Sequence, residues 1–414
     1  MSTRPERPPV RVAVVSLHTS PLDPPGSGDS GGMNVEIRAV AERLSERGVA
    51  VDVFTRCSGT PGVEWIAPLA RVVKVRSGPC APVPKGSLTD LVDGFAESVV
   101  EAATERYDVV HAHYWLSGPA AARVAERWEV PFVASFHTLA EIKNRALAEG
   151  DVPEQLSRLA GERQTVRLAR RLVAPTVTEA RNLVDLYEAD AERIRIVPPG
   201  VDHDLFFPRA GSRRRLGLDD APLVLFAGRL QPLKGPDVAL RAFAEARRGS
   251  SELTDARLLV VGGPSGERGE ATQRELRTLA AEEGVAESVR FLGPRPHAEL
   301  PWLYAAADVL MMPSRSESFG LAALEAQACG LPVVASDVGG LRHAVVDGES
   351  GLLVRDVGGA AAALRRLLTD DGERARLGRG ARLHAGGFTW DRTADGLLDV
   401  YGELASEALP AAAS

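Results

Sequence analysis

The stretch 313–330 contains two glutamates, Glu317 and Glu325, that are eight residues apart. Glu317 follows an apolar run that is typical of a strand, and we place Glu325 two turns into the helix that comes next. Because eight residues make about two helical turns, both carboxylates can line one face. Carboxylates accept paired hydrogen bonds from vicinal hydroxyls such as those of sugar and ribose rings. The spacing therefore favours a site for a polyhydroxylated ligand over an ordinary surface helix.

The stretch 228–235 places two cations, Arg229 and Lys234, between a predicted strand and the helix after it. A guanidinium fork and a compact ammonium at this position suit a diphosphate, whose charge grows as its bond to a sugar breaks. A solvated basic loop is the alternative, but both cations flank apolar residues rather than other charges. We therefore predict a diphosphate site in this loop.

The loop 26–34 is rich in glycine and lies between the first predicted strand and a helix. Glycines let a backbone approach a ligand closely, and the start of a helix offers free N–H groups to an anion. The loop lacks the G-x-G-x-x-G fingerprint, and the second strand ends at Arg56 rather than at an acid, which disfavours a nicotinamide cofactor. A simple turn is the alternative interpretation of this loop.

Two patterns have the residue types of metal ligands, but we predict structural roles for both. Asp202 and Asp204 follow a Pro-Pro-Gly turn between the halves of the chain, where we expect them to cap a turn or a helix. His111 and His113 have no acid or cysteine at ligand spacing, so we expect a structural pair. The sequence therefore predicts no metal ligand.

Short β-branched runs alternate with helical patterns through most of the chain, which indicates parallel sheets with helices on both faces. In the first half we predict strands at 10–17, 51–55, 108–111, 132–136, 172–175 and 194–197. In the second half we predict strands at 223–228, 257–262, 289–292, 309–313, 332–336 and 351–354. Stretches such as 34–46 and 154–170 are predicted helices.

These elements predict an α/β fold of two facing Rossmann-like domains. We place the first domain at 1–200 and the second at 201–388, because the turn-rich segment 198–202 separates two runs of strands. A last helix over 391–405, within the segment 389–414, is expected to pack back on the first domain. Ligands of open parallel sheets bind beyond the carboxyl ends of strands. The candidate site residues occupy that position, so we predict one interdomain cleft.

Composition and charge exclude several classes of protein. The 414 residues include 49 basic and 56 acidic side chains, a net charge of −7, whereas a nucleic-acid binder normally shows a basic face. No apolar run approaches the roughly 18 residues of a membrane span. Residues 1–10 lack the apolar core of a signal peptide, so we expect a cytoplasmic protein. Because Cys57, Cys80 and Cys329 are odd in number, we expect no disulfide framework.

From about residue 10 to residue 405 the chain resembles the retaining family-4 glycosyltransferases, which have two facing Rossmann-like domains, the GT-B fold. The resemblance rests on the paired glutamates and the two cations. It implies that Glu317 holds the hydroxyls of a donor sugar, that Glu325 binds the ribose of its nucleotide, and that the cations clamp its diphosphate. The donor-binding residues that it implies are Gly31, Gly32, Arg229, Lys234, Arg295, Glu317, Phe319, Gly320, Leu321 and Glu325.

Within this family the first half resembles the D-inositol-3-phosphate glycosyltransferases that begin mycothiol synthesis, and sucrose-phosphate synthases share part of the pattern. The matching strings are 18–22, 28–34, 113–118, 137–140 and 143–144. The acceptor-binding residues that the resemblance implies are His18, Met33, Asn34, Lys85, Tyr114, His137, Thr138 and Arg158.

Four of these residues would hold a phosphate on the acceptor: Lys85, Tyr114, Thr138 and Arg158. Without a phosphate, Lys85 and Arg158 would face each other unpaired. Asn34 and His137 would hold hydroxyls of the inositol and the sugar. For Lys85, one of only four lysines in the chain, an isolated loop lysine is the alternative.

The chain departs from the family's usual residues at three places. Pro24 and Pro25 precede the glycine-rich loop where Gln-Pro is usual, Glu36 stands where tyrosine is common, and Arg315 replaces an aromatic residue. The resemblance implies that no metal is required, although this branch can hold Mg²⁺ through backbone carbonyls, here near residues 304–307.

The resemblance implies a retaining hexosyltransferase that uses UDP-GlcNAc as donor and 1D-myo-inositol 3-phosphate as acceptor. Its catalytic residues would be His137, Arg229, Lys234 and Glu317. No general base is evident, so the leaving phosphate oxygen would take the acceptor's proton while the protein orients the substrates and stabilises charge. Closure of the two domains would expel water.

Three alternatives stay open from the sequence. A relative in antibiotic synthesis would use an aminocyclitol or a thiol as acceptor, with a GDP-sugar as donor. A nucleotide-sugar epimerase would need no acceptor pocket, and a sugar-phosphate binding protein would need no catalysis. The partners we expect are a nucleotide-sugar donor and a small phosphorylated acceptor, without nucleic acid or a membrane span; a homodimer is also compatible with the sequence.

Overall fold

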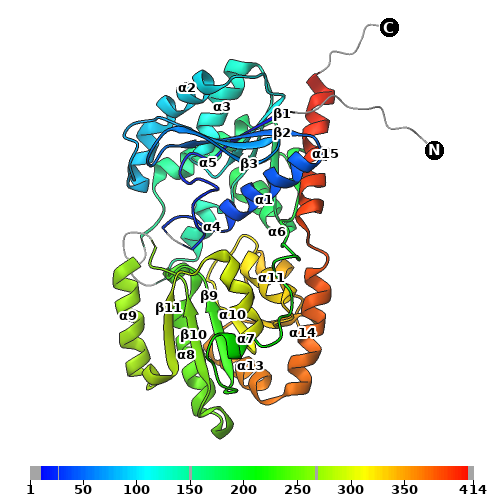
Figure 1. The fold of residues 1–414 in the computed structure, drawn as a ribbon. Coiled ribbons are helices and arrows are strands. Elements are labelled where there is room, and N and C mark those ends of the chain that lie inside the picture. The colour runs from blue at the N-terminus through cyan, green and yellow to red at the C-terminus, as the bar shows by residue number, and fades with distance from the viewer. Residues whose placement is uncertain (1–10, 27, 149–151, 266–268, 409–414) are drawn as a thin grey trace, which may run out of the picture.

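The computed structural model describes residues 11–26, 28–148, 152–265 and 269–408. Two α/β domains lie one above the other in Figure 1, each built on a largely parallel sheet. The predicted fold class is confirmed. Val10, which begins the first predicted strand, lies outside the described residues.

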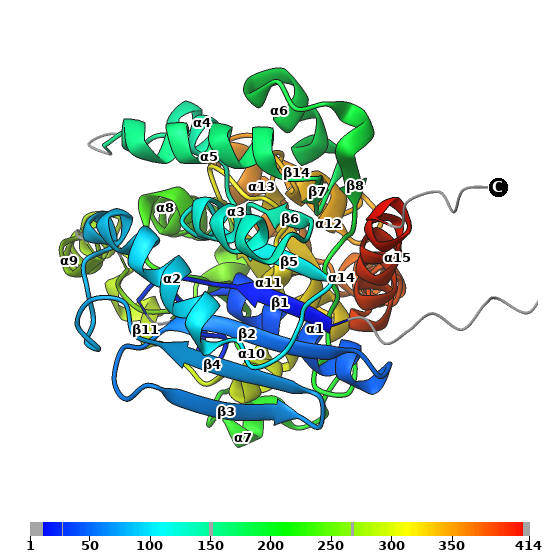
Figure 2. The same ribbon diagram turned by 90° about the horizontal axis from the view of Figure 1, so that it is seen from above.

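The first domain contains an eight-stranded sheet with the order β3-β4-β2-β1-β5-β6-β7-β8 (Figure 2). Its strands are β1 (Arg11–Val15), β2 (Ala50–Arg56), β3 (Gly62–Ala67), β4 (Ala70–Val75), β5 (Val109–His113), β6 (Phe132–Ser135), β7 (Arg171–Ala174) and β8 (Ile194–Ile196). Its helices are α1 (Gly32–Glu46), α2 (Val92–Ala102), α3 (Ser117–Trp128), α4 (Ala140–Arg145), α5 (Leu156–Leu168) and α6 (Val177–Tyr187). Side chains of β1 alternate between two cores: Val12 and Val14 pack with α1, whereas Ala13 and Val15 pack with α2 and α3.

The second domain contains a six-stranded, fully parallel sheet with the order β11-β10-β9-β12-β13-β14. Its strands are β9 (Leu223–Ala227), β10 (Arg257–Val261), β11 (Val289–Gly293), β12 (Val309–Met312), β13 (Val333–Ser336) and β14 (Gly351–Val354). Its helices are α7 (Ser212–Arg215), α8 (Pro236–Arg248), α9 (Gly269–Glu282), α10 (Leu300–Ala306), α11 (Leu321–Ala328), α12 (Leu341–Ala344), α13 (Val357–Thr369) and α14 (Asp371–Ala385). Val224 and Phe226 of β9 pack with α8 and α13, and Leu225 packs with α10 and α11.

The last helix, α15 (Trp390–Ala408), follows the second domain and packs on the first (Figure 1). Tyr401 is buried in the core that α1 also lines. Glu403 forms ion pairs with Arg171 and Arg195 of the first sheet, at 3.1 and 2.8 Å. The predicted return of this helix is therefore confirmed. No described helix is long and apolar enough to cross a membrane.

One hairpin at the edge of the first sheet was not predicted. β3 and β4 pair antiparallel, and β4 then pairs in parallel with β2. Most of β3 is exposed, and Trp65 shows 62% of its surface. β3 therefore lacks the buried β-branched run that is typical of a predicted strand, whereas β4 has such a run and was also missed. The expectation of parallel pairing is wrong at this edge.

A disulfide joins Cys57, just after β2, to Cys80 in the loop after β4, with 5.0 Å between the Cα atoms. The expectation of no disulfide framework is therefore wrong. The odd count is explained by Cys329, which is buried and free. The pairing of β2 with β4 brings both cysteines to the same end of the sheet, and spacing along the chain does not reveal that proximity. Arg56 also donates hydrogen bonds to two backbone carbonyls of the same loop.

Candidate active site

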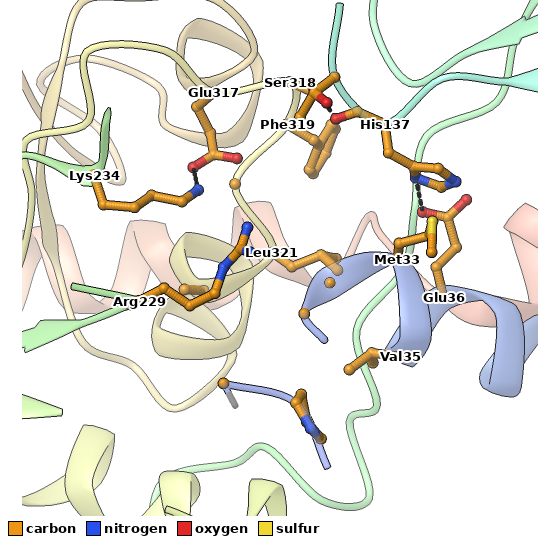
Figure 3. A pocket seen from close by; sticks show the side chains of 18 of the residues that line it. Met33, Val35, Glu36, His137, Arg229, Lys234, Glu317, Ser318, Phe319 and Leu321 are labelled. Atoms are coloured by element: carbon orange, nitrogen blue, oxygen red, sulfur yellow. Dashed lines mark hydrogen bonds and ion pairs between the residues drawn. The ribbon is translucent and has the colours of Figure 1, made fainter. Parts of the chain in front are cut away.

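The carboxyl ends of the two sheets meet at a cleft of about 350 Å³ between the domains, part of which is shown in Figure 3. All of the predicted donor-binding residues line this cleft: Gly31, Gly32, Arg229, Lys234, Arg295, Glu317, Phe319, Gly320, Leu321 and Glu325. Most of the predicted acceptor-binding residues also line it: His18, Met33, Lys85, Tyr114, His137 and Thr138. The topology thus brings residues from both halves of the chain to one site, as open parallel sheets do.

Arg229 and Lys234 form the cationic corner of the cleft (Figure 3). Arg229 follows β9, and Lys234 ends a 3₁₀ turn that leads into α8. Gly235 has φ = 66°, and a Cβ atom there would lie 2.1 Å from the carbonyl oxygen of Pro313, so only glycine lets this turn approach the loop after β12. Lys234 Nζ therefore reaches Glu317 Oε2, at 2.5 Å. Two loops thus hold a cation and a carboxylate together.

Glu317 lies on the loop between β12 and α11. Its carbonyl oxygen accepts a hydrogen bond from the N–H of Gly340 over 2.8 Å. A Cβ atom on Gly339, where φ is 46°, would lie 2.3 Å from the same oxygen, so glycine allows this close contact. Because α11 begins at Leu321, Glu325 lies about one turn into the helix, and its predicted place two turns in is wrong. Both carboxylates nevertheless line the cleft.

Both carboxylate oxygens of Glu325 have partners within the protein. His297 Nε2 lies 2.7 Å from Oε1, and the Tyr304 hydroxyl donates to Oε2 over 3.1 Å. Burial lowers the pKa of His297, but the charge and hydrogen bond of Glu325 outweigh burial and raise that pKa above its ordinary value. These partners fix the orientation of the carboxylate at the cleft wall.

Lys85, Tyr114 and Thr138 form a second polar corner on the first domain. The Lys85 ammonium lies 4.7 Å from the centroid of the Tyr114 ring and 4.0 Å from Asp29. His18 packs against the same ring with 4.3 Å between centroids. Burial and the neighbouring cations lower the pKa of His18, so its ring is neutral. The corner therefore presents one ammonium beside neutral hydrogen-bonding groups.

Arg158 is buried behind this corner and is not among the residues that line the cleft. Its guanidinium pairs with Glu162 at 2.8 Å and with Glu154 at 3.0 Å, and it donates to the Thr138 hydroxyl over 3.0 Å. The expectation that Lys85 and Arg158 face each other unpaired is therefore wrong. Arg158 supports Thr138 from behind, and the two acidic partners already balance its charge.

Asn34 is also buried and is not among the lining residues. Its side-chain oxygen accepts a hydrogen bond from the N–H of Gly31 over 3.1 Å, and its amide donates to the carbonyl oxygen of Ser20. These bonds tie the start of α1 to the loop after β1. In this structure Asn34 therefore positions Gly31 and Gly32 at the cleft.

His137 follows β6 and lies at the base of the cleft (Figure 3). Its Nε2 lies 2.8 Å from Nδ1 of His113, and its Nδ1 lies 3.8 Å from Oε2 of Glu36. Burial lowers the pKa of His137 to about 4, so the ring is neutral near pH 7. One potential ligand atom from each of the three side chains lies within 4.8 Å of the others. The contacts, however, use opposite nitrogens of His137, which fits a chain of hydrogen-bonding groups better than one ion.

Asp202 and His111 have the structural contacts that we predicted, whereas His113 contacts the cleft residue His137. The Asp202 carboxylate accepts a hydrogen bond from the N–H of Asp204 over 2.9 Å and so caps a turn. His111 is buried between the hydroxyls of Tyr401 and Ser135, at 2.7 and 2.9 Å. Neither group faces the cleft.

One carbonyl oxygen of the segment 304–307, that of Ala306, is a poor ligand for Mg²⁺. The carbonyl oxygen of Ala306 accepts a hydrogen bond from the Arg213 guanidinium over 3.0 Å. The carbonyl oxygen of Leu303, just before the segment, accepts one from the N–H of Ala307. A divalent cation at the Ala306 oxygen would lie beside the Arg213 guanidinium, and this positive charge disfavours binding.

Several residues at the cleft were not predicted as site residues: Asp29, Glu36, Lys143, His297 and Tyr304. Asp29 lies 3.9 Å from Arg229 and 4.0 Å from Lys85, and thus between the cationic corner and the polar corner. Its place in the glycine-rich loop is a signal that could have identified it. The signal for Lys143 is the scarcity of lysine in this chain.

Comparison with known proteins places this geometry in a family. The model of Glycosyltransferase Family 4 matches residues 30–205, and that of Glycosyl transferases group 1 matches residues 209–384. The chain is 52% identical to the D-inositol 3-phosphate glycosyltransferase of Acidothermus cellulolyticus, over 98% of this chain and 92% of that protein. Identity to the protein of the same name from Stackebrandtia nassauensis is 50%, over 96% and 92% of the two chains.

Solved structures show the same architecture. Sucrose-phosphate synthase from Thermosynechococcus elongatus superposes with a TM-score of 0.89 at 30% identity, covering 96% of this chain and 100% of that one. The Anabaena protein HepE, in complex with UDP and glucose, shares the fold with a TM-score of 0.76 at 20% identity, covering 95% and 100%. The chain therefore belongs to glycosyltransferase family 4 and, within it, to the family of the D-inositol 3-phosphate glycosyltransferases.

Proposed function

We propose that this protein transfers N-acetylglucosamine from UDP-GlcNAc to 1D-myo-inositol 3-phosphate with retention at the anomeric carbon, the first step of mycothiol synthesis. One observation carries the proposal: a single cleft joins a cationic corner with Arg229 and Lys234 to a second corner with Lys85. Such a cleft suits one substrate with a diphosphate and another with a phosphate. Relatives named for this acceptor, at 52% and 50% identity, support the choice.

When the donor binds, the ion pair between Lys234 and Glu317 would be replaced by contacts of both side chains with the donor. Lys234 is paired with Glu317 in the structure. A bound diphosphate attracts the Lys234 ammonium and the Arg229 fork, and Glu317 then accepts hydrogen bonds from the sugar hydroxyls. The N–H groups at the start of α11 add further donors for phosphate oxygens. Glu325, which His297 and Tyr304 hold in place, accepts hydrogen bonds from the ribose.

In the transfer step, an acceptor hydroxyl attacks the anomeric carbon on the face from which the diphosphate leaves. The carbon–oxygen bond to the diphosphate breaks as the new glycosidic bond forms, and the hydroxyl proton passes to the leaving phosphate oxygen. Arg229 and Lys234 stabilise the charge that develops on that oxygen, and the cleft orients both substrates. We propose that these two cations make a metal unnecessary, and that the reaction takes place in the cytoplasm.

The direct test uses the purified protein with UDP-GlcNAc and three acceptors: inositol 3-phosphate, free inositol and an aminocyclitol. We expect a glycosylated phosphate product by mass spectrometry, with retained anomeric configuration by NMR. A reaction with donor alone tests the epimerase alternative, and GDP-GlcNAc tests the donor base. Transfer only to the aminocyclitol, or an epimerised donor without transfer, would replace this proposal.

A further inference from the structure

Glu36 is a cleft residue that none of the roles above uses. It lies in the second turn of α1, and 18% of its side chain is exposed. Figure 3 shows its carboxylate beside Met33, turned toward His137. Among the described residues, none donates a hydrogen bond to this carboxylate, and its one ion-pair contact is His137. Its oxygens are therefore free to accept hydrogen bonds from a ligand in the cleft.

The distance between Glu36 and His137 suits a bridging group. Oε2 of Glu36 and Nδ1 of His137 are 3.8 Å apart, which is too far for a hydrogen bond. An oxygen placed about 2.8 Å from each atom would contact both. A hydroxyl satisfies both contacts at once, because it donates to the carboxylate and accepts from the imidazole.

The proton on His137 can be assigned from its other contact. His137 Nε2 lies 2.8 Å from His113 Nδ1, and one of the two nitrogens donates to the other. We assign the donor to His113, because the neutral His137 ring then carries its proton on Nδ1, toward the Glu36 carboxylate, instead of facing that carboxylate with a lone pair. Nδ1 is then a hydrogen-bond donor at the cleft, opposite the carboxylate acceptor.

The groups around Glu36 make such a ligand favourable. His137 and His113 face it from the first sheet, Glu179 approaches from α6, and the Tyr401 hydroxyl approaches from α15. None of these groups is a cation near pH 7, and burial alone raises the pKa of Glu36 to about 7. A buried carboxylate without a partner is costly, so a donated hydrogen bond from a ligand stabilises it.

We propose that Glu36 is a specificity-determining residue, which together with His137 holds one ring hydroxyl of a polyhydroxylated substrate. The carboxylate accepts a hydrogen bond from the hydroxyl, and the imidazole donates one to the hydroxyl oxygen. The proposal rests on the proposed function, because that function supplies two substrates with such rings, the sugar of the donor and the cyclitol of the acceptor. The chemistry is the same for both, and the experiment distinguishes them.

The test compares Glu36→Ala and Glu36→Gln with wild type and with Glu42→Ala. Glu42 is a matched control, because it lies on the same helix, does not line the cleft, and among the described residues pairs with Arg38 alone. Binding of UDP-GlcNAc and of inositol 3-phosphate is measured by calorimetry, and KM and kcat are measured where turnover allows. We expect Glu36→Ala to lower the affinity for one of the two substrates about tenfold or more, and Glu36→Gln to lower it less. Glu42→Ala should leave both affinities unchanged.

Deoxy and deoxyfluoro analogues of the weakened substrate then identify the hydroxyl. Removal of the bound hydroxyl should cost wild type at least the factor of Glu36→Ala, because it also removes the contact with His137, and it should cost Glu36→Ala less than it costs wild type. If Glu36→Ala weakens the affinity for inositol 3-phosphate alone, the hydroxyl is on the acceptor. If it weakens the affinity for UDP-GlcNAc alone, the hydroxyl is on the donor.

The proposal is overturned if both affinities stay within twofold of wild type in Glu36→Gln and Glu36→Ala. If Glu36→Ala does not fold, the isosteric Gln variant decides the question alone. Failure of the proposed function is a separate result, because the wild-type protein would then bind neither substrate and form no glycosylated product.

Discussion

At the scale of single residues, the charged side chains of the site form ion pairs and hydrogen bonds with one another. Lys234 is paired with Glu317, whereas the carboxylate of Glu325 is fixed by His297 and Tyr304. In the proposed function the first pair would open to bind a diphosphate and a sugar, whereas the second arrangement can stay as it is. The two glutamates therefore contribute differently, although the sequence presents them as one spaced pair.

Lys234→Ala and Glu325→Ala should each reduce kcat/KM by one to several orders of magnitude. The first change removes a charge from the diphosphate, and the second removes hydrogen bonds to the ribose, each on the order of 2–4 kcal/mol. Steady-state kinetics with varied UDP-GlcNAc measures both effects. Lys74→Ala is the control, because Lys74 pairs with Glu64 on the edge hairpin, away from the cleft. Turnover within threefold of wild type in both site variants would contradict the donor assignment.

Arg158 should affect stability more than substrate choice. Its partner Glu162 is fully buried, so Arg158→Ala leaves a carboxylate without its cation, at a cost of about 3–5 kcal/mol. Urea unfolding of the variant and wild type measures this difference. Lys85→Ala should unfold like wild type, because 39% of the Lys85 side chain is exposed and its acidic contact is 4.0 Å long. Equal stability of all three proteins would show that the buried pair is not structural.

Glu36 should make the stability of the free protein depend on pH. Burial raises its pKa from 4.5 to about 7, so the protonated form favours the folded state. This contribution is fully present below about pH 4.5 and is lost as the pH rises through about 7. Glu36→Gln stays neutral, so its Tm should exceed that of wild type above pH 8 and approach it near pH 5. A Tm difference that does not change with pH would contradict the burial argument.

At the scale of elements, the sequence predicts well where local patterns reflect burial. Every buried strand except β4 follows from an apolar run, as does the returning C-terminal helix, and β14 (Gly351–Val354) has the predicted bounds. β4 was missed although most of its residues are buried. The exposed strand β3 has no such pattern and was missed. The candidate site was predicted where charged residues follow strands, as at Arg229 and Lys234. It was missed or misjudged where contacts between distant segments decide the role, as for His297 and Arg158.

The disulfide between Cys57 and Cys80 should stabilise the first domain. It closes a loop with a sequence separation of 23, and the loop-entropy estimate for such a length is about 3 kcal/mol. Cys80→Ser, or treatment with a dithiol reductant, should therefore lower the free energy of unfolding, measured in urea, by roughly that amount. Cys329→Ser serves as the control for reduction, since that variant should respond to the reductant as wild type does. No change on reduction, with two additional free thiols titrated, would contradict this prediction.

At the scale of the whole molecule, the two domains meet directly around the cleft. Ser265 of the second domain donates to the carbonyl oxygen of Gly28 in the first over 2.6 Å, and Ser318 donates to the carbonyl oxygen of His137. The second domain carries the cationic corner with Arg229 and Lys234, and the first domain carries the polar corner with Lys85. The two corners line one cleft because the two domains lie against each other, so neither half of the sequence forms the cleft alone.

The central claim is that one cleft joins a sugar donor to a phosphorylated cyclitol. The most direct test is the ratio of kcat/KM for inositol 3-phosphate to that for free inositol, in wild type, Lys85→Ala and Lys74→Ala. We expect a ratio of about a hundred or more in wild type and in Lys74→Ala, because a phosphate gains charge-assisted hydrogen bonds at the Lys85 corner. The ratio should fall about tenfold or more in Lys85→Ala. Equal rates with the two acceptors in wild type, or an unchanged ratio in Lys85→Ala, would contradict the account.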